Sequence, residues 1–346
     1  MRAFLLLVAI IGLASASLAV ARDWQALAER QQIELKDFVF HTGEVLPSVT
    51  MNVYTLGAPR RDDKGNVTNA VMLLHGTGGS GRSLLRPSFG DELFGPGQPL
   101  DIEKHYIISP DNLGHGDSSK PSDGMLTAYP RYDYNDMVLA QRRMLTEGLS
   151  VEKLELIIGT SMGCMHSFVW GIEHPGFVRR FVPLACNAIE IAGRNRMMRK
   201  IIIDGFRDDP AYNNGAYKDP ADLQMGQTIF AYTLILAGSN PYQLQVESPT
   251  REQAEAALSG YVERRQSNPV DPTDTIYQFD ASRNYNPAPQ LAEIKAPVLW
   301  INSADDFINP PGLGDPEGLA AQMKKARFVL IPASEETRGH GTHSAA

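Results

Sequence analysis

The chain of 346 residues contains only two cysteines, Cys164 and Cys186, and no C-x-x-C motif. Two cysteines cannot form a disulfide scaffold, and a chain of this length can bury a core without one. They could pair in an oxidising compartment, but we favour two buried, small apolar side chains. The eight histidines show no cluster at the spacing of a metal site. We therefore expect no metal and no other cofactor.

Positive charge is also scarce, because the chain carries a formal net charge of −8. This argues against nucleic acid or an anionic membrane surface as the main partner. Beyond the first 21 residues, no apolar run is long enough to cross a bilayer. We expect a small-molecule partner and no stable membrane span. The sequence leaves the oligomeric state open, and a homodimer is one possibility.

The one long apolar run lies at the start of the chain. Arg2 supplies a positive charge, residues 3–13 are apolar, and Ala19-Val20-Ala21 is typical of a signal-peptide cleavage site. The run is short for a membrane span. We therefore predict that residues 1–21 are a cleaved signal peptide, with an uncleaved N-terminal anchor as the alternative. The mature chain would carry a net charge of −9 and be periplasmic or secreted.

Strand-like apolar runs alternate with amphipathic helical runs through most of the chain. This alternation is typical of an α/β protein with a mostly parallel sheet flanked by helices. The predicted strands are residues 37–41, 49–54, 70–74, 106–109, 154–158, 181–184, 298–302 and 328–331. The predicted helices that flank the sheet are residues 134–147, 162–174 and 317–325.

Residues 187–291 interrupt this rhythm with helical stretches at 195–207, 225–237 and 251–265, separated by clusters of Pro, Gly and Asn. We expect an inserted helical lid here, between two parts of one core, residues 22–186 and 292–346. Some of its large side chains either line a substrate pocket or, as we favour, pack the lid onto the core. These are Met197, Met198, Met225, Phe230 and Tyr232.

The segment Gly159-Thr160-Ser161-Met162-Gly163 matches the G-x-S-x-G pattern, with an apolar strand before it and a helix-prone segment after it. A strand, a sharp turn and a helix are the context in which this pattern presents a reactive serine. The two glycines stand where a Cβ would collide with a neighbouring strand or helix. We therefore predict that Ser161 is a nucleophile.

A serine nucleophile needs a base and an acid that orients the base. The acid is expected after the seventh predicted strand, where Asp306 lies four residues before Pro310, and Asp305 is the alternative. The base is expected after the last strand, where we predict His340, with His343 as the alternative. No other histidine follows the acid.

Two backbone N–H groups are expected to hold the developing oxyanion, and we assign them to Met162 and Thr77. Thr77 lies in a Gly-rich run at residues 75–81, which has neither the Lys-Ser/Thr ending of a phosphate loop nor the G-x-G-x-x-G pattern. The segment 111–119 is expected to support this run. His115 and Asp117, which precede the nucleophile, would be structural.

Together these residues resemble the α/β-hydrolase superfamily and, within it, the homoserine O-acetyltransferase branch. The similarity is carried by residues 40–47, 69–76, 159–165, 209–217, 277–280, 306–311 and 339–340. It implies an α/β-hydrolase fold with Ser161 as nucleophile, Asp306 as acid and His340 as base. It also implies a lid arginine that holds an amino-acid carboxylate, for which Arg196 and Arg199 are the candidates.

Two activities follow from this resemblance. The first is an exported serine hydrolase that cleaves a carboxylic ester through an acyl-enzyme, and the predicted signal peptide favours it because acetyl-CoA is cytosolic. The second is an O-acyltransferase that moves an acetyl group from acetyl-CoA to an alcohol such as homoserine. A non-catalytic binding protein is the third interpretation. A dehalogenase or epoxide hydrolase fits less well, because it would have Asp in place of Ser161.

Overall fold

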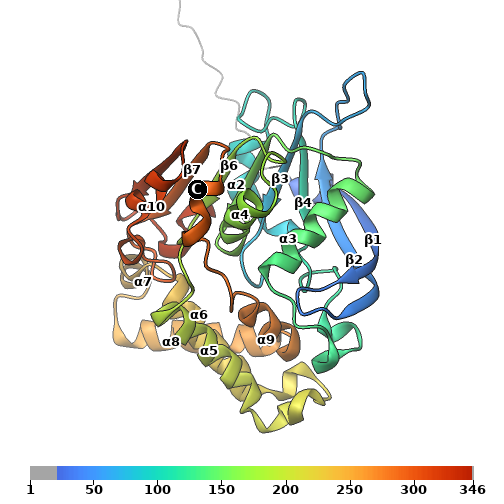
Figure 1. The fold of residues 1–346 in the computed structure, drawn as a ribbon. Coiled ribbons are helices and arrows are strands. Elements are labelled where there is room, and N and C mark those ends of the chain that lie inside the picture. Colours follow the sequence, from blue (N-terminus) through green and yellow to red (C-terminus); the bar gives the residue numbers. More distant parts are fainter. Residues whose placement is uncertain (1–21, 345–346) are drawn as a thin grey trace, which may run out of the picture.

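The computed structural model describes residues 22–344 and contains one eight-stranded sheet in the order β1-β2-β4-β3-β5-β6-β7-β8 (Figure 1). The pairings β1–β2 and β2–β4 are antiparallel, and the remaining pairings are parallel. The strands are β1 Glu29–Val39, β2 Val45–Leu56, β3 Ala70–Leu74, β4 Tyr106–Pro110, β5 Leu156–Thr160, β6 Phe181–Leu184, β7 Val298–Ser303 and β8 Ala326–Ile331. The predicted α/β architecture with a mostly parallel sheet is confirmed. The predicted signal peptide, residues 1–21, lies outside the described residues.

Both faces of the sheet are covered, so the central strands are continuous apolar runs. Every residue of β3 is buried. Met72 and Leu74 join one apolar cluster with α3 and α4, while Val71 and Leu73 join a second cluster with α2. The helices on the two faces are α1 Trp24–Leu27, α2 Pro87–Leu93, α3 Tyr134–Arg143, α4 Met162–Glu173 and α10 Pro316–Gln322.

Several element boundaries differ from the sequence prediction. The β1–β2 hairpin is longer than predicted. Most residues of β1 are exposed and only Leu35 and Phe38 are buried, so the first part of this strand has no apolar run in the sequence. Helix α3 ends at Arg143, and the chain continues in a π-helical turn over Met144–Gly148.

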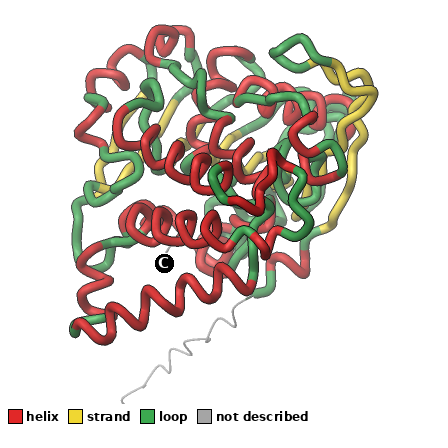
Figure 2. Tube along the Cα trace, turned by 90° about the horizontal axis from the view of Figure 1, so that it is seen from below, coloured by secondary structure: helices red, strands yellow, loops and turns green. Residues whose placement is uncertain are grey.

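Five helices follow one another between β6 and β7, within the predicted insertion 187–291. They are α5 Gly193–Arg207, α6 Gln224–Gly238, α7 Pro241–Glu247, α8 Arg251–Ser267 and α9 Pro272–Asp280. Figure 1 shows them at one end of the molecule, and Figure 2 shows the same end from below, with helices in red. Phe206, Phe230 and Phe279 belong to an apolar cluster of their own, whereas α8 has no buried residue.

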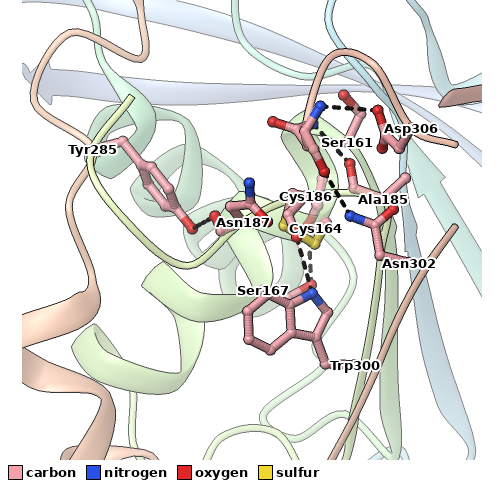
Figure 3. Close-up of a disulfide and its surroundings, with 12 residues drawn as sticks. Ser161, Cys164, Ser167, Ala185, Cys186, Asn187, Tyr285, Trp300, Asn302 and Asp306 are labelled. Carbon is pink, nitrogen blue, oxygen red and sulfur yellow. Dashed lines mark hydrogen bonds between the residues drawn. A yellow bond between two sulfur atoms is a disulfide. The ribbon is translucent and has the colours of Figure 1, made fainter. Parts of the chain in front are cut away.

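The structure joins Cys164 and Cys186 in a disulfide, with Cα atoms 5.9 Å apart (Figure 3). The preference for two unpaired cysteines was therefore wrong. The pairing depends on a tertiary relationship, since Cys164 lies in the first turn after β5 and Cys186 follows β6, the neighbouring strand. Both side chains are fully buried, as predicted. Within residues 22–344, no helix combines the length and the apolar character of a membrane span.

Candidate active site

Ser161 lies in a sharp turn between β5 and α4. Its backbone has φ 53° and ψ −110°, a region that residues other than glycine rarely adopt, and such strain is found mostly at functional sites. A Cβ at Gly159 would lie 2.0 Å from the carbonyl oxygen of Gly163, and a Cβ at Gly163 would lie 2.2 Å from that of Leu74. The glycines of the motif therefore allow the helix to pack closely against the strands.

The structure brings the three predicted residues together in one series of hydrogen bonds. His340 Nε2 lies 2.9 Å from Ser161 Oγ, and His340 Nδ1 lies 2.9 Å from Asp306 Oδ2. The Asp306 side chain is fully buried. Because a carboxylate only accepts hydrogen bonds, Nδ1 carries the ring proton, and Nε2 is left to accept the serine hydroxyl. This is the arrangement in which a serine can lose its proton to a histidine.

The second carboxylate oxygen of Asp306 is held by its own loop. Oδ1 accepts the backbone N–H of Ile308 at 2.9 Å and that of Asn309 at 2.8 Å. The Asn309 side chain donates to the carbonyl of Ala185 at 2.9 Å. Ala185 lies beside the disulfide in Figure 3 and has a left-handed backbone, with φ 60°. Sequence reasoning missed Asn309, because its partner belongs to a turn more than a hundred residues away.

Asp305, the alternative acid, holds the loop that carries His340 rather than the histidine ring. Its Oδ2 accepts the backbone N–H of Gly339 at 3.0 Å, the hydroxyl of Thr337 at 2.8 Å and the side-chain amide of Asn240 at 2.6 Å. Asn240 precedes α7, so the carboxylate also ties this loop to the inserted helices. Asp305 thus holds the loop before His340, whereas Asp306, the next residue, holds the His340 ring.

His343, the alternative base, lies beside His340, with the ring centroids 5.8 Å apart. It is His340 that makes the hydrogen bond to Ser161. Burial lowers the pKa of His343 to about 3, so its ring is neutral at physiological pH. His343 therefore contributes a neutral wall to the site.

The Gly-rich run lies directly against the nucleophile. A Cβ on Gly76 would lie 3.2 Å from the Cβ of Ser161, and the N–H of Gly163 donates to the carbonyl of His75 at 3.1 Å. The backbone N–H groups of Thr77 and Met162 make no backbone hydrogen bond within residues 22–344. Both predicted donors are therefore available to an oxyanion that forms beside Ser161.

A buried chain of hydrogen bonds fixes this run. His75 Nδ1 donates to the carbonyl of Gly76 at 2.8 Å, and Nε2 accepts the backbone and side-chain N–H groups of Asn112 at 3.1 and 3.0 Å. Burial lowers the pKa of His75, which keeps its ring neutral and able to play both roles. Gln141 donates to Asn112 at 2.5 Å, and Trp170 donates to Gln141 at 2.6 Å.

The segment 111–119 supports the same run, as predicted. Asp111 Oδ1 accepts the N–H of Gly81 at 2.6 Å, and Oδ2 accepts the N–H of Asp117 at 2.8 Å. His115 is buried, and this burial lowers its pKa well below the ordinary value. The Asp117 side chain pairs with Arg30 at 2.9 Å. None of these groups contacts Ser161.

Ser161 and His340 open into a mostly apolar cavity of about 580 Å³. Its opposite wall is formed by α5, α6 and α8, with Phe279 from α9. Of the large lid side chains considered from sequence, Met198 lines this cavity, Phe230 packs inside the inserted helices, and Met197, Met225 and Tyr232 are exposed.

The two candidate arginines lie in different surroundings. Arg199 is 5% exposed and lines the cavity. Its guanidinium donates to the Asn195 side chain at 2.9 Å and to the carbonyl of Phe279 at 3.4 Å, and no acidic residue in the described chain pairs with it. Arg196 instead pairs with Asp280 at 3.3 Å. A buried cation without an anionic partner is costly, so Arg199 makes the cavity attractive to an anionic group.

Comparisons with known proteins agree with this architecture. A family model described as alpha/beta hydrolase fold matches residues 69–336. A probable acyltransferase from Methanothermobacter thermautotrophicus is 28% identical, over 86% of this chain and 89% of that protein. A homoserine O-acetyltransferase from Clavibacter michiganensis is 26% identical, over 82% of this chain and 79% of that protein.

Among solved structures, an acetylester hydrolase from Corynebacterium glutamicum superimposes with a TM-score of 0.78 at 18% identity. The match covers 91% of this chain and 90% of that chain. At this identity the similarity establishes the fold alone. Acyltransferases and an ethyl acetate hydrolase both occur among the sequence relatives, and esterases and homoserine O-acetyltransferases both occur among the similar solved structures. The comparisons are therefore consistent with both reactions.

Proposed function

Because the chain belongs to the α/β-hydrolase family, we propose that it is an exported serine hydrolase that cleaves carboxylic esters. One observation carries this proposal. It is the series of hydrogen bonds that links Ser161, His340 and Asp306 at one wall of a mostly apolar cavity. The coarser conclusion, an enzyme that is either an esterase or an acyltransferase, agrees with both groups of similar proteins.

The reaction begins when Ser161 Oγ attacks the ester carbonyl and His340 Nε2 takes the hydroxyl proton. Asp306 stabilises the imidazolium that forms, through the Nδ1–H hydrogen bond. The oxyanion lies between the N–H groups of Thr77 and Met162. Each such donor contributes roughly 3 kcal/mol to stabilising the transition state.

The tetrahedral intermediate collapses when His340 gives its proton to the departing alcohol, which leaves an acyl group on Ser161. Water then enters, loses a proton to the same nitrogen and attacks the acyl carbonyl. The bond between Ser161 Oγ and the acyl carbon then breaks, His340 returns its proton to Oγ, and the carboxylic acid is released. Every proton in this sequence moves through His340 Nε2, the nitrogen that lies 2.9 Å from Ser161 Oγ.

The disulfide supports the proposed export. Disulfides form and persist in oxidising compartments and are rare in the cytosol. The pairing of Cys164 with Cys186 therefore agrees with the cleavable signal peptide predicted at residues 1–21. An enzyme in that location has water and esters available but not acetyl-CoA, which favours hydrolysis over transfer.

Arg199 favours a second candidate, an O-acyltransferase whose acceptor carries a carboxylate. Its buried guanidinium faces the cavity without an anionic partner, as a site for a hydroxy acid or an amino acid would require. The same residue would serve an esterase whose substrate carries a free carboxylate. The two activities share the acyl-enzyme and differ in the group that attacks it.

The test uses residues 22–346 and their Ser161→Ala variant. Each is mixed with 4-nitrophenyl acetate or with acetyl-CoA, and intact mass spectrometry follows the acyl group on the protein. We expect an acetyl adduct on Ser161 and a kcat for ester hydrolysis on the order of 10⁶-fold above that of the variant. Equal hydrolysis by both proteins contradicts the proposal. Thiol release from acetyl-CoA that depends on added homoserine would favour the transferase.

A further inference from the structure

A second cavity, of about 330 Å³, lies on the other side of α9 from the candidate active site. Consecutive residues of α9 line the two spaces, since Phe279 faces the first cavity and Asp280 faces the second. The second cavity is enclosed partly by the loop that follows residue 126 and partly by the inserted helices. It contains none of the residues assigned to ester cleavage.

The wall of this cavity is rich in positive charge. Arg131, Arg207 and Arg283 line it, and Asp280 is the only acidic residue among the described residues that do so. This excess of positive charge is confined to the cavity wall, whereas the chain as a whole is acidic, with a formal net charge of −8. A concave surface of this charge attracts anions.

Two of the arginines are held in place before any ligand binds. Arg283 donates to the backbone carbonyls of Tyr132 and Arg131, both at 2.8 Å. Arg131 pairs with Asp280 at 2.5 Å. Asp280 therefore helps to orient these arginines, but one carboxylate cannot neutralise the charge of the three guanidinium groups at this wall.

Arg207 is the third arginine that lines this cavity. Within residues 22–344 its guanidinium makes no hydrogen bond or ion pair, although it lies at the cavity wall. Tyr212 and Tyr277 contribute aromatic rings to the wall of the same cavity, and Ile276 contributes an apolar side chain. A planar guanidinium next to aromatic surface suits an organic molecule with an oxyanion group, because the fork of N–H donors matches carboxylate and phosphate.

We propose that this cavity is a second binding site, for a small organic anion whose carboxylate or phosphate group is held by Arg131 and Arg207. Its volume lies at the lower end of the range of small-molecule pockets, about 300–1,000 Å³. Tyr212 and Tyr277 contact the apolar part of the ligand. Arg131 precedes α3 in the core and Arg207 ends α5, so the bound anion bridges the core and the inserted helices.

The experiment measures binding of benzoate and of phenyl phosphate to residues 22–346 by calorimetry. These probes share a ring and differ in the oxyanion, so their affinities show which group the site prefers. We expect saturable binding of at least one probe, weakened about tenfold or more by Arg207→Ala. Benzyl alcohol, which has the ring but no charge, should not bind.

Arg207→Ala should leave the fold unchanged, because it breaks no hydrogen bond or ion pair of the described chain. Arg251→Ala, at an exposed arginine that lines neither cavity, is the matched control and should bind as the wild type does. Arg199→Ala separates the two cavities, since binding at the second cavity should survive it. The proposal is overturned if neither probe binds, or if Arg207→Ala binds as tightly as the wild type.

Discussion

The Asn309 side chain donates to the carbonyl of Ala185 at 2.9 Å, while the Asn309 backbone donates to Asp306 at 2.8 Å. Ala185 has a left-handed backbone and directly precedes Cys186, which the disulfide joins to Cys164 on α4. The loop that carries the candidate acid is thus tied to the helix that begins beside the candidate nucleophile. We infer that Asn309 is a positioning residue.

Replacing Asn309 tests this relationship. Asn309→Ala removes the hydrogen bond to Ala185 and frees the loop around Asp306. We expect kcat for ester hydrolysis to fall about tenfold, which is about 1.4 kcal/mol in the barrier, with KM little changed. Steady-state kinetics would measure this. Asn268→Ala, at an exposed position after α8, is the control, and an Asn309→Ala enzyme of wild-type kcat contradicts the inference.

The disulfide should stabilise the fold more than it affects the reaction. Its cysteines are 22 residues apart, and closing a loop of that length contributes roughly 3 kcal/mol to the free energy of unfolding. We expect the double variant Cys164→Ala/Cys186→Ala to unfold at a clearly lower urea concentration and still to hydrolyse ester at 25 °C. Denaturation curves of both proteins, with and without a thiol reductant, provide the comparison. Equal midpoints would show that the bond adds no stability.

Asp306 and Asp305 should respond differently to replacement by asparagine. Asp306→Asn removes the carboxylate that holds the proton on His340 Nδ1, and we expect a loss of about 10⁴-fold in kcat. Asp305→Asn disturbs the hydrogen bonds that Asp305 accepts from Gly339, Thr337 and Asn240. The His340 ring takes part in none of them, so we expect a loss nearer tenfold. Measuring both variants on one ester decides the assignment. The reverse order would make Asp305 the acid.

Arg199 should determine preference for charged substrates. We expect Arg199→Ala to raise KM at least tenfold for an ester with a free carboxylate, because a hydrogen bond to a charged group contributes about 1.5–3 kcal/mol. The KM for a neutral ester of similar size should stay the same. Arg196→Ala is the control, since Arg196 pairs with Asp280. If both esters lose affinity equally in the Arg199 variant, its role is structural.

Stability should fall as the solution becomes acidic. Burial lowers the pKa of His166 to about 3 from an ordinary value of 6.5. Below pH 6.5 the unfolded chain binds a proton at this residue that the folded protein excludes, so the free energy of unfolding falls as pH falls toward about 3. Between these two values, the free energy of unfolding falls by about 1.4 kcal/mol per pH unit for this group.

The variant His166→Asn tests this linkage, because the asparagine oxygen can replace Nδ1 as the acceptor for Gln141. We expect its unfolding free energy to depend less steeply on pH between about 4 and 6.5 than that of the wild type. Urea denaturation at a series of pH values measures both slopes. Parallel curves would mean that His166 does not titrate on unfolding.

The fold was predictable where burial leaves a pattern in the sequence. The strands on both sides of Ser161 are apolar at nearly every position, so their number and their positions along the chain could be inferred, but not their order in the sheet. The strand that begins at Glu29 was predicted to start at residue 37, because its first residues are exposed and show no apolar run. The short helices α7 and α9 were not predicted, since their turns lie among Pro and Asn residues.

The candidate site was predictable where its chemistry is local. Ser161 stands in a self-contained motif, and His340 and Asp306 follow from their order along the chain; their catalytic roles remain predictions that the variants above test. The disulfide and Asn309 were not predictable, because the disulfide depends on the neighbouring ends of β5 and β6 and the Asn309 contact on those of β6 and β7. Arg199 and Arg196 lie three residues apart on one helix, and only tertiary features distinguish them: Arg199 lines the cavity, and Arg196 pairs with Asp280.

Helix α8 has no buried residue, yet Tyr261 from this helix forms part of the wall opposite Ser161. Its attachment to α6 includes one hydrogen bond, from Gln266 to Thr228 at 3.1 Å. Substitutions along this helix can therefore reshape the space for the acyl or alcohol group at small energetic cost. Evolution or design could change the preferred substrate here while Ser161, His340 and Asp306 stay untouched.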